Sequence, residues 1–173
     1  MSEATPNSGP EGGAPTGPQN GEAPSLVVLA QYLKDLSFEN PKAPASFTDQ
    51  GRSQPQIDVD VNVNARGIGK DRYEVELTVS ARAKQGADVA FVVETAYAGA
   101  FEIKNMTPEQ LEMIMLVECP RILFPFVRQI VADATRNGNF PPLMLEPIDF
   151  YTIYEQNRAR AMAERGAAQP AHA

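Results

Sequence analysis

The feature that most constrains the fold is the long apolar segment at residues 107–142, TPEQLEMIMLVECPRILFPFVRQIVADATRNGNFPP. Thr107 and the proline after it fit a capped helix start, with the hydroxyl at the N-cap and proline at the first helical position. Apolar side chains then recur at helical spacing over a surface wider than one packing partner needs. We expect Cys119-Pro120 to end or kink the first helical segment, and Asn137-Gly138-Asn139 to supply a left-handed stop.

Three stretches before this segment alternate between apolar and polar residues with the period of a β-strand. They lie at residues 57–64, 73–82 and 87–103. The two glycines of residues 65–71 favour a hairpin connection between the first two stretches, and Gln85-Gly86 turns the chain before the third. The alternation predicts half-solvated antiparallel strands.

Residues 25–40, SLVVLAQYLKDLSFEN, begin with large apolar residues and then alternate, which indicates another strand. The alternation assigns two sets of side chains to opposite faces: Tyr32, Leu36 and Phe38 to one, and Asp35, Ser37 and Glu39 to the other. A helix over LVVLAQYLKDL is the competing interpretation. The prolines that follow predict a loop to about residue 55.

Strands followed by helices, rather than alternating with them, predict an α+β domain. We expect a four-stranded antiparallel sheet with helices packed on one face and a wet, acidic opposite face. A last helix begins at Asp149 as N-cap. Its expected inner stripe is Phe150, Ile153, Tyr154 and Asn157.

The two ends of the chain differ in composition from its middle. Residues 1–24 contain five prolines, five glycines and three acids but no base and no aromatic residue, which predicts a disordered tail. Residues 158–173 are expected to form a frayed C-terminal tail. A single domain at 25–157 remains.

The formal net charge of −7 argues against nucleic-acid backbones and anionic membranes as partners. We find no apolar run of membrane-spanning length and no signal-peptide pattern, so we expect a cytoplasmic protein that does not insert into membranes. The single cysteine, Cys119, excludes an intramolecular disulfide.

The residues needed for catalysis are missing. The one histidine, His172, is next to the last residue, so neither a Ser-His-acid nor a Cys-His arrangement can form in the folded part. Cys119 is expected to be a buried, inert thiol, and no metal-ligand set or cofactor motif is present. The pairs Asp58/Asp60 and Glu74/Glu76 are interpreted as a solvated sheet surface. These observations predict a protein that is not an enzyme and has no cofactor.

Apolar surface, in contrast, exceeds what a small monomeric domain can cover, which predicts self-association. The proline-interrupted aromatic segments at residues 122–126 and 140–144 keep flexible and aromatic side chains available, as at a promiscuous apolar binding surface. An ordinary hydrophobic core is the alternative interpretation of both segments.

At these residues the chain resembles the SecB family of bacterial protein-export chaperones, over about residues 26–154. The resemblance is carried by YLKDLSFENPKAP, YEVELTVSA, FVVETAYAGAF and VECPRILFPFVRQIVADATRNGNFPPLMLEPIDF. It implies a homotetramer, a dimer of dimers with helices packed between two sheets. It also implies grooves that hold unfolded precursor proteins without ATP, and delivery of these proteins to the translocation motor SecA.

The resemblance also suggests roles for particular residues. Four match the positions by which SecB-like proteins contact SecA: Asp35, Glu39, Val92 and Glu94. Three match positions linked to tetramer assembly: Val93, Thr95 and Tyr97. Ser53 departs from the family, which often has tryptophan there.

We further expect unfolded clients to lie as extended segments against a set of apolar side chains. These are Phe38, Phe47, Val59, Val61, Phe124, Phe126, Leu143 and Met144. The alternative function is an oligomeric ligand-binding or scaffold protein without chaperone activity, built on the same frame of sheet and helices.

Overall fold

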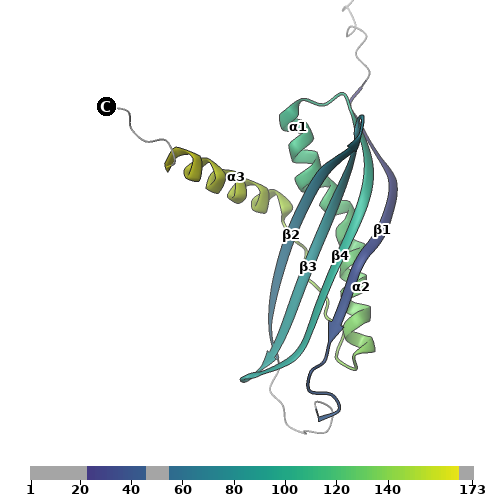
Figure 1. Ribbon diagram of the computed structural model, residues 1–173, viewed down its shortest axis with the longest axis vertical. Coiled ribbons are helices and arrows are strands. Elements are labelled where there is room, and N and C mark those ends of the chain that lie inside the picture. The colour runs from purple at the N-terminus through teal and green to yellow at the C-terminus, as the bar shows by residue number, and fades with distance from the viewer. Residues whose placement is uncertain (1–22, 46–54, 168–173) are drawn as a thin grey trace, which may run out of the picture.

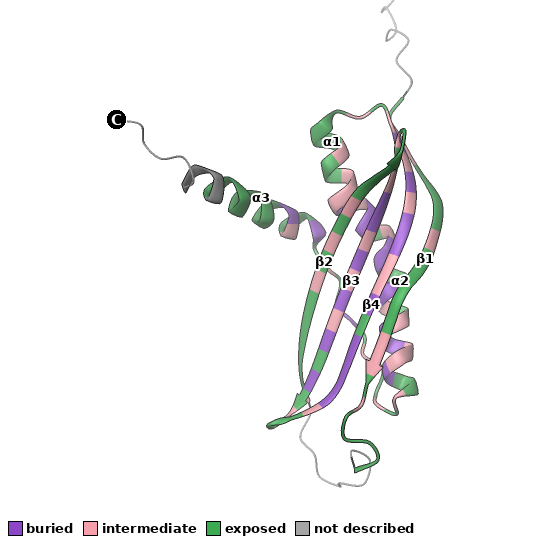
Figure 2. Cartoon of the chain, in the orientation of Figure 1, coloured by how far each residue is buried: buried purple, intermediate pink, exposed green. Residues whose placement is uncertain are grey.

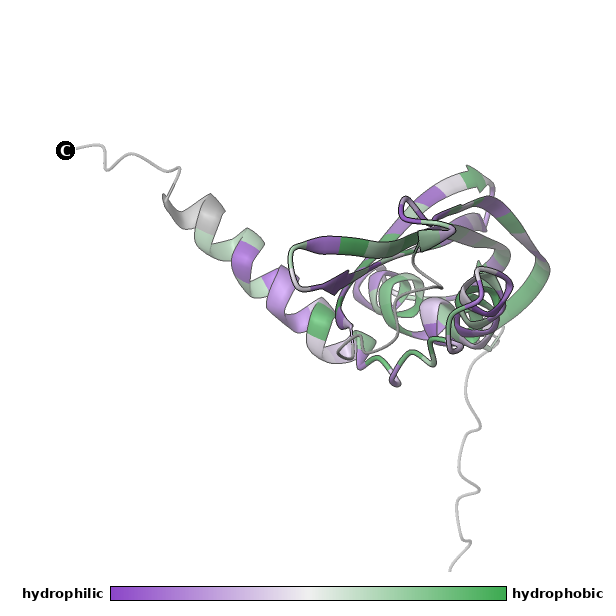
Figure 3. Cartoon of the chain, turned by 90° about the horizontal axis from the view of Figure 1, so that it is seen from below, coloured by the Kyte–Doolittle hydropathy of each residue, from purple (hydrophilic) through white to green (hydrophobic). Residues whose placement is uncertain are grey.

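The computed structural model describes residues 23–45 and 55–167, without the side chains of 164–167. One antiparallel sheet in the order β1-β4-β3-β2 carries its helices on one face, as Figures 1 and 3 show. The predicted α+β class with a four-stranded sheet is confirmed. The elements in chain order are β1 (Ser25–Glu39), β2 (Gln56–Gly69), β3 (Arg72–Gln85), β4 (Asp88–Lys104), α1 (Pro108–Met113), η2 (Ile114–Glu118), α2 (Cys119–Asn137) and α3 (Phe150–Ala167).

The core lies between α2 and the two central strands. Alternate residues of β3, such as Val75, Leu77 and Val79, are fully buried beneath the helices. Figure 2 shows the same pattern, with burial concentrated on β3 and β4 and exposure on the edge strands β1 and β2. Cys119 is also fully buried, and burial raises the pKa of its thiol to about 12. The expectation of a buried thiol is therefore confirmed, and the raised pKa disfavours the reactive thiolate.

The expected helix start is present at Thr107, whose hydroxyl accepts from the Gln110 backbone N–H while the Gln110 side chain accepts from the Thr107 N–H. The expected interruption near Cys119-Pro120 takes a particular form. One π-helical turn, η2, joins α1 to α2, and Pro120 lies in the first turn of α2. Because proline lacks a backbone N–H, a widened turn before it lets the helical path continue.

The end of α2 differs in detail from the prediction. The left-handed residue is Asn139, with φ 63°, whereas Gly138 has φ −75°. Gly138 is needed for space instead, because a Cβ atom there would overlap the ring of Phe38. That ring stacks on Phe91 with centroids 5.9 Å apart.

The connection between β2 and β3 is shorter than the predicted loop at residues 65–71. The strands extend to a two-residue turn at Lys70 and Asp71, where Asp71 has φ 56°. A register shift between Gly67 and Gly69 absorbs one residue within the ladder. The glycines therefore flank a bulge at Ile68 rather than forming the turn itself.

Two similar bulges interrupt β1, and they correct the predicted faces of this strand. Val28 pairs with Phe101 and Ala30 with Ala100, so Leu29 is an extra residue; in the same way Lys34 is extra between Leu33 and Asp35. Each bulge reverses which face the following residues occupy. As a result Tyr32 lies on the face without helices, and the prediction that it shares a face with Leu36 and Phe38 was wrong.

The last helix begins as predicted, because the Asp149 carboxylate accepts from the backbone N–H groups of Tyr151 and Thr152. Phe150 and Tyr154 are buried, but Asn157 is exposed and does not belong to an inner stripe. The helix continues to Ala167, ten residues past the expected end of the domain, and projects from the body of the molecule (Figure 1). Predictions for residues 1–22, Phe47, Ser53 and 168–173 lie outside the described residues.

Candidate functional site

An open groove of about 540 Å³ runs between β2 and the irregular segment that follows α2. Its lining is mostly apolar. The residues that line it are Ile57, Val59, Asp60, Val61, Leu143, Met144, Leu145, Glu146, Pro147, Ile148 and Ile153. Alternation in β2 brings Ile57, Val59 and Val61 to the same side, because only every second residue of a strand shares a face.

The opposite wall of this groove is held by one buried side chain, Thr135. Its hydroxyl donates toward the Val131 and Ala132 carbonyl groups of α2 and accepts from the Leu143 backbone N–H at 2.9 Å. The Phe140 N–H also donates to the Thr135 carbonyl. A segment with few regular hydrogen bonds is thereby fixed to the end of α2.

The eight predicted client-binding residues do not form one surface. Val59, Val61, Leu143 and Met144 meet in the groove, and Phe47 lies outside the described residues. The other three are elsewhere. Phe124 is buried against Phe150, Phe126 stacks on Tyr97 with centroids 5.6 Å apart, and Phe38 packs with Phe91 and Phe140.

Sequence reasoning missed Ile57, Asp60, Ile153 and the stretch 145–148 as groove residues. The signal for Ile57 was available, since it alternates in phase with Val59 and Val61. A second hollow, which shares Val61 and Ile153 with the groove, continues between β2, α1 and α3. It is also lined by charged side chains from both helices, Glu109 and Glu112 of α1 and Arg158 of α3.

The four residues predicted to contact SecA lie together on the sheet face that no helix covers. In the ladder between β1 and β4, Glu39 pairs with Val92, Ser37 with Glu94, and Asp35 with Ala96. Paired residues share a face, so the three acids lie in a row along the outer face, and Val92 beside them is only 8% exposed. We call Asp35, Glu39, Val92 and Glu94 the outer acidic patch.

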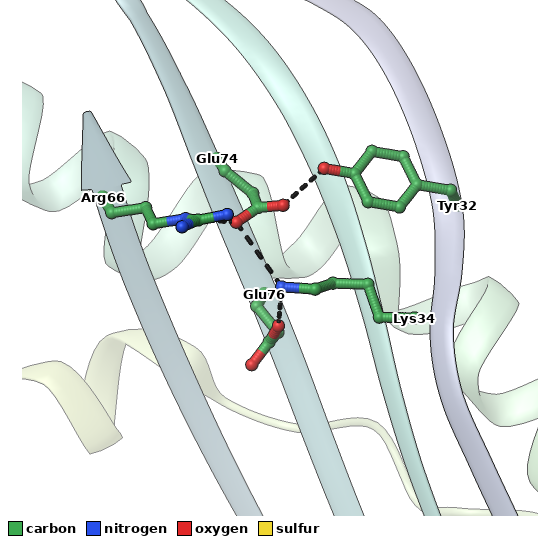
Figure 4. Close-up of polar contacts among 5 residues, drawn as sticks. All are labelled: Tyr32, Lys34, Arg66, Glu74 and Glu76. Atoms are coloured by element: carbon green, nitrogen blue, oxygen red, sulfur yellow. Dashed lines mark hydrogen bonds and ion pairs between the residues drawn. The ribbon is translucent and has the colours of Figure 1, made fainter. Parts of the chain in front are cut away.

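Next to this patch, a network of five polar side chains spans the sheet (Figure 4). The Glu74 carboxylate accepts from the Tyr32 hydroxyl and from Arg66, both at 2.5 Å. Lys34 lies 3.5 Å from Glu74 and 2.5 Å from Glu76. Ala96, Ala98 and Ala100 occupy the intervening strand β4, so the long side chains of β1 can cross above it to β3.

Glu74 is only 5% exposed, so the prediction that Glu74 and Glu76 form a solvated surface pair was wrong for this residue. Its hydrogen bonds with Arg66 and Tyr32, and the nearby Lys34 charge, lower its pKa to about 2. The same hydrogen bond raises the pKa of Tyr32, because the phenol is held in its protonated form.

The three residues predicted to act in assembly lie on the helix-covered face. Val93 and Thr95 are buried within the chain itself, and the Thr95 hydroxyl donates to the Asp35 carbonyl at 3.2 Å. Tyr97 is half-buried under Phe126, which is 43% exposed. Of the three, Tyr97 lies closest to the molecular surface.

Within residues 23–45 and 55–167, no cluster of three or more His, Cys, Asp or Glu side chains could hold a metal ion. In the same part of the chain, none of the helices has the length and apolar character required to traverse a bilayer.

Comparison with known proteins gives a consistent result. Residues 19–161 match the family described as preprotein translocase subunit SecB. The chain is 50% identical over 147 residues to the protein-export protein SecB of Rhodopseudomonas palustris strain TIE-1, covering 85% of this chain and 93% of the relative. It is 49% identical over 149 residues to the corresponding protein of Maricaulis maris, covering 86% and 84%.

Among solved structures, the chain is similar to a SecB-like chaperone of Mycobacterium tuberculosis, solved in complex with a peptide from an antitoxin. The TM-score is 0.59 at 19% identity, covering 71% of this chain and 90% of the other. At this identity the likeness supports the fold.

Proposed function

This chain belongs to the SecB family, a family of protein-export chaperones rather than enzymes, and we propose that it is an ATP-independent holdase. In this role it keeps precursor proteins unfolded in the cytoplasm and delivers them to the translocation motor SecA. The observation that carries the proposal is the open apolar groove along β2.

The groove suits an extended chain of variable sequence. β2 is an edge strand of the sheet formed by the described residues, so one row of its backbone groups points away from the sheet. An extended client can pair with that row while every second side chain enters the groove. Each buried client aromatic contributes roughly 2 to 3 kcal/mol, so tight but releasable binding needs several such contacts.

The outer acidic patch supports a separate docking site for a basic region of SecA. It lies on the face opposite the helices, so a carrier loaded along β2 keeps the patch accessible. Contact through such rim charges is steered electrostatically and weakens as salt rises.

A homotetramer is the assembly that we propose. Large apolar side chains remain exposed on β1, including Val28, Leu33 and Leu36, and Phe126 is exposed on α2. Tyr97 contributes to the proposed interface directly, beside Phe126. Val93 and Thr95 contribute indirectly, through the packing that positions β1. Covering these side chains with further copies removes an apolar surface from water.

The test is suppression of aggregation of a chemically denatured precursor, without nucleotide. Wild-type protein should suppress aggregation, and Val59→Asp should suppress it several-fold less, because a charge in the groove must lose water when an apolar segment binds. Ile68→Asp is the matched control, since Ile68 is on the same strand and is 47% exposed against 43% for Val59.

Two outcomes would contradict the proposal. Wild-type protein without effect on aggregation would favour an oligomeric ligand-binding or scaffold protein. Equal effects of Val59→Asp and Ile68→Asp would place client binding outside the groove.

A further inference from the structure

The bulge at Lys34 decides which way Asp35 faces. Tyr32 lies on the face without helices, where it bonds Glu74. Phe38 lies on the helix-covered face, where it packs with Phe91 and Phe140. Both are even-numbered, so regular alternation would put them on the same face, and one extra residue is required somewhere between them.

The faces occupied by Tyr32 and Phe38 do not by themselves fix the position of the extra residue. With the bulge at Lys34, as observed, Asp35 pairs with Ala96 and faces outward. With the extra residue moved two positions along, to Leu36, Tyr32 and Phe38 would keep their faces, but Asp35 would face the helices. The outer acidic patch would then lose one of its three acids while Glu39 and Glu94 stayed in place.

Lys34 is held in the bulge by side chains on another strand. Its ammonium group reaches over β4 to Glu76 at 2.5 Å and Glu74 at 3.5 Å (Figure 4). Glu74 is fixed in turn by Tyr32 and Arg66. With the extra residue at Leu36, Lys34 would still face outward but would lie opposite Ala96, farther along the strand from Glu76 and Glu74, so both ion pairs would lengthen.

We infer that Lys34 is a positioning residue for the outer acidic patch: its ion pairs with Glu74 and Glu76 fix the bulge that turns Asp35 outward. This inference rests on the proposed docking of SecA at the patch. The alternative is that Lys34 acts only through its own charge. The two explanations predict opposite changes in SecA affinity when the Lys34 charge is removed. Removing a cation beside an acidic patch should by itself strengthen binding of a basic partner.

The experiment measures SecA affinity by titration calorimetry for the full-length protein and for Lys34→Gln, Asp35→Asn and the double variant. Asp35→Asn should weaken binding about two- to fivefold, the range of a rim ion pair. Lys34→Gln should weaken binding by a similar factor, and Asp35→Asn should add little in the Lys34→Gln background. Glu94→Gln should keep its full effect in that background, and Lys34→Arg should bind like wild type.

A second measurement does not depend on SecA. Asp35 and Ala96 are directly opposite each other on one face, so cysteines at these two positions should form a disulfide on oxidation. Lys34→Gln should lower the cross-linked fraction, and Lys34→Arg should preserve it.

Three results would each overturn the inference. Lys34→Gln could bind SecA as tightly as wild type or more tightly, Asp35→Asn could keep its full effect in the Lys34→Gln background, or Lys34→Gln could leave the cross-linked fraction undiminished. If Asp35→Asn and Glu94→Gln both bind like wild type, the proposed docking surface fails, and the cross-link alone decides the role of Lys34. Mass and aggregation suppression should match wild type in each variant. If Lys34→Gln does not fold, Tyr32→Phe, which changes no charge, should give the same loss of affinity and cross-linking.

Discussion

Glu74 illustrates how a residue with an ordinary sequence context acquires an unusual environment. In the sequence it is one of two acids in an alternating strand, which is typical of a solvated surface. Its partners Tyr32 and Arg66 come from the two edge strands, and alanines on β4 leave room for Tyr32 to reach it. No local pattern predicts this arrangement, because it depends on strand order and on two bulges.

The depressed pKa of Glu74 predicts a pH dependence of stability. A carboxylate whose folded pKa is about 2, below its ordinary value of 4.5, contributes stability that is fully present above pH 4.5. The contribution is lost as the pH falls from 4.5 toward 2. Urea unfolding should therefore show Glu74→Gln to be less stable than wild type at pH 7, with a gap that closes across this window.

Glu155→Gln, which alters an exposed carboxylate on α3, is the matched control and should follow the wild type. A gap for Glu74→Gln that stays constant from pH 7 to pH 3 would show that the network does not hold the charged form.

At the scale of elements, the segment between α2 and α3 owes its shape to Thr135. We expect Thr135→Val, which keeps the volume but removes the hydroxyl, to leave the Leu143 N–H unpaired and to lower the free energy of unfolding by about 1 to 3 kcal/mol. Hydrogen exchange at the Leu143 amide should accelerate. Client affinity should fall, since Leu143 and Met144 line the groove.

Thr135→Ser keeps the hydroxyl and is the control for this substitution. It should preserve slow exchange at Leu143 even if the lost methyl group lowers stability. Equal exchange rates in the valine and serine variants would mean that the hydroxyl does not hold the segment.

The elements also show what sequence alone can predict. The strands at β2 and β3, the Thr107 cap and the Asp149 cap follow from alternation and capping residues, which are local signals. The bulges at Leu29 and Lys34 were missed because no characteristic residue type marks an extra residue in an edge strand. Part of each groove wall was predicted, Val59 and Val61 on β2 and Leu143 and Met144 on the segment after α2. How that segment is held depends on the tertiary contact of Thr135, which has no local signal.

For the whole molecule, the uneven cover of the sheet is the main consequence of the fold. Helices protect β3 and β4, whereas β1 exposes Val27, Leu29 and Leu33, each between 46% and 47%. A monomer with this strand uncovered would present a long apolar edge, which is a hazard for aggregation.

We therefore expect light scattering at micromolar concentration to give the mass of four chains of 18.8 kDa. Tyr97→Glu should reduce the mass to that of a dimer, because a buried unpaired charge costs several kcal/mol, about the scale of an interface. Ile68→Asp should leave the mass unchanged. A monomeric mass for the wild type would rule out the assembly.

Because Cys119 is buried, the rate of its chemical modification reports how often the core opens. Its thiol is fully buried and has a pKa of about 12, and it is the only thiol in the sequence. A thiol-specific dye added to the folded protein thus meets no reactive group until the core opens. The modification rate of Cys119 is therefore proportional to the frequency of core opening. A comparison of the rates with and without a bound client measures how far client binding stabilises the folded chaperone.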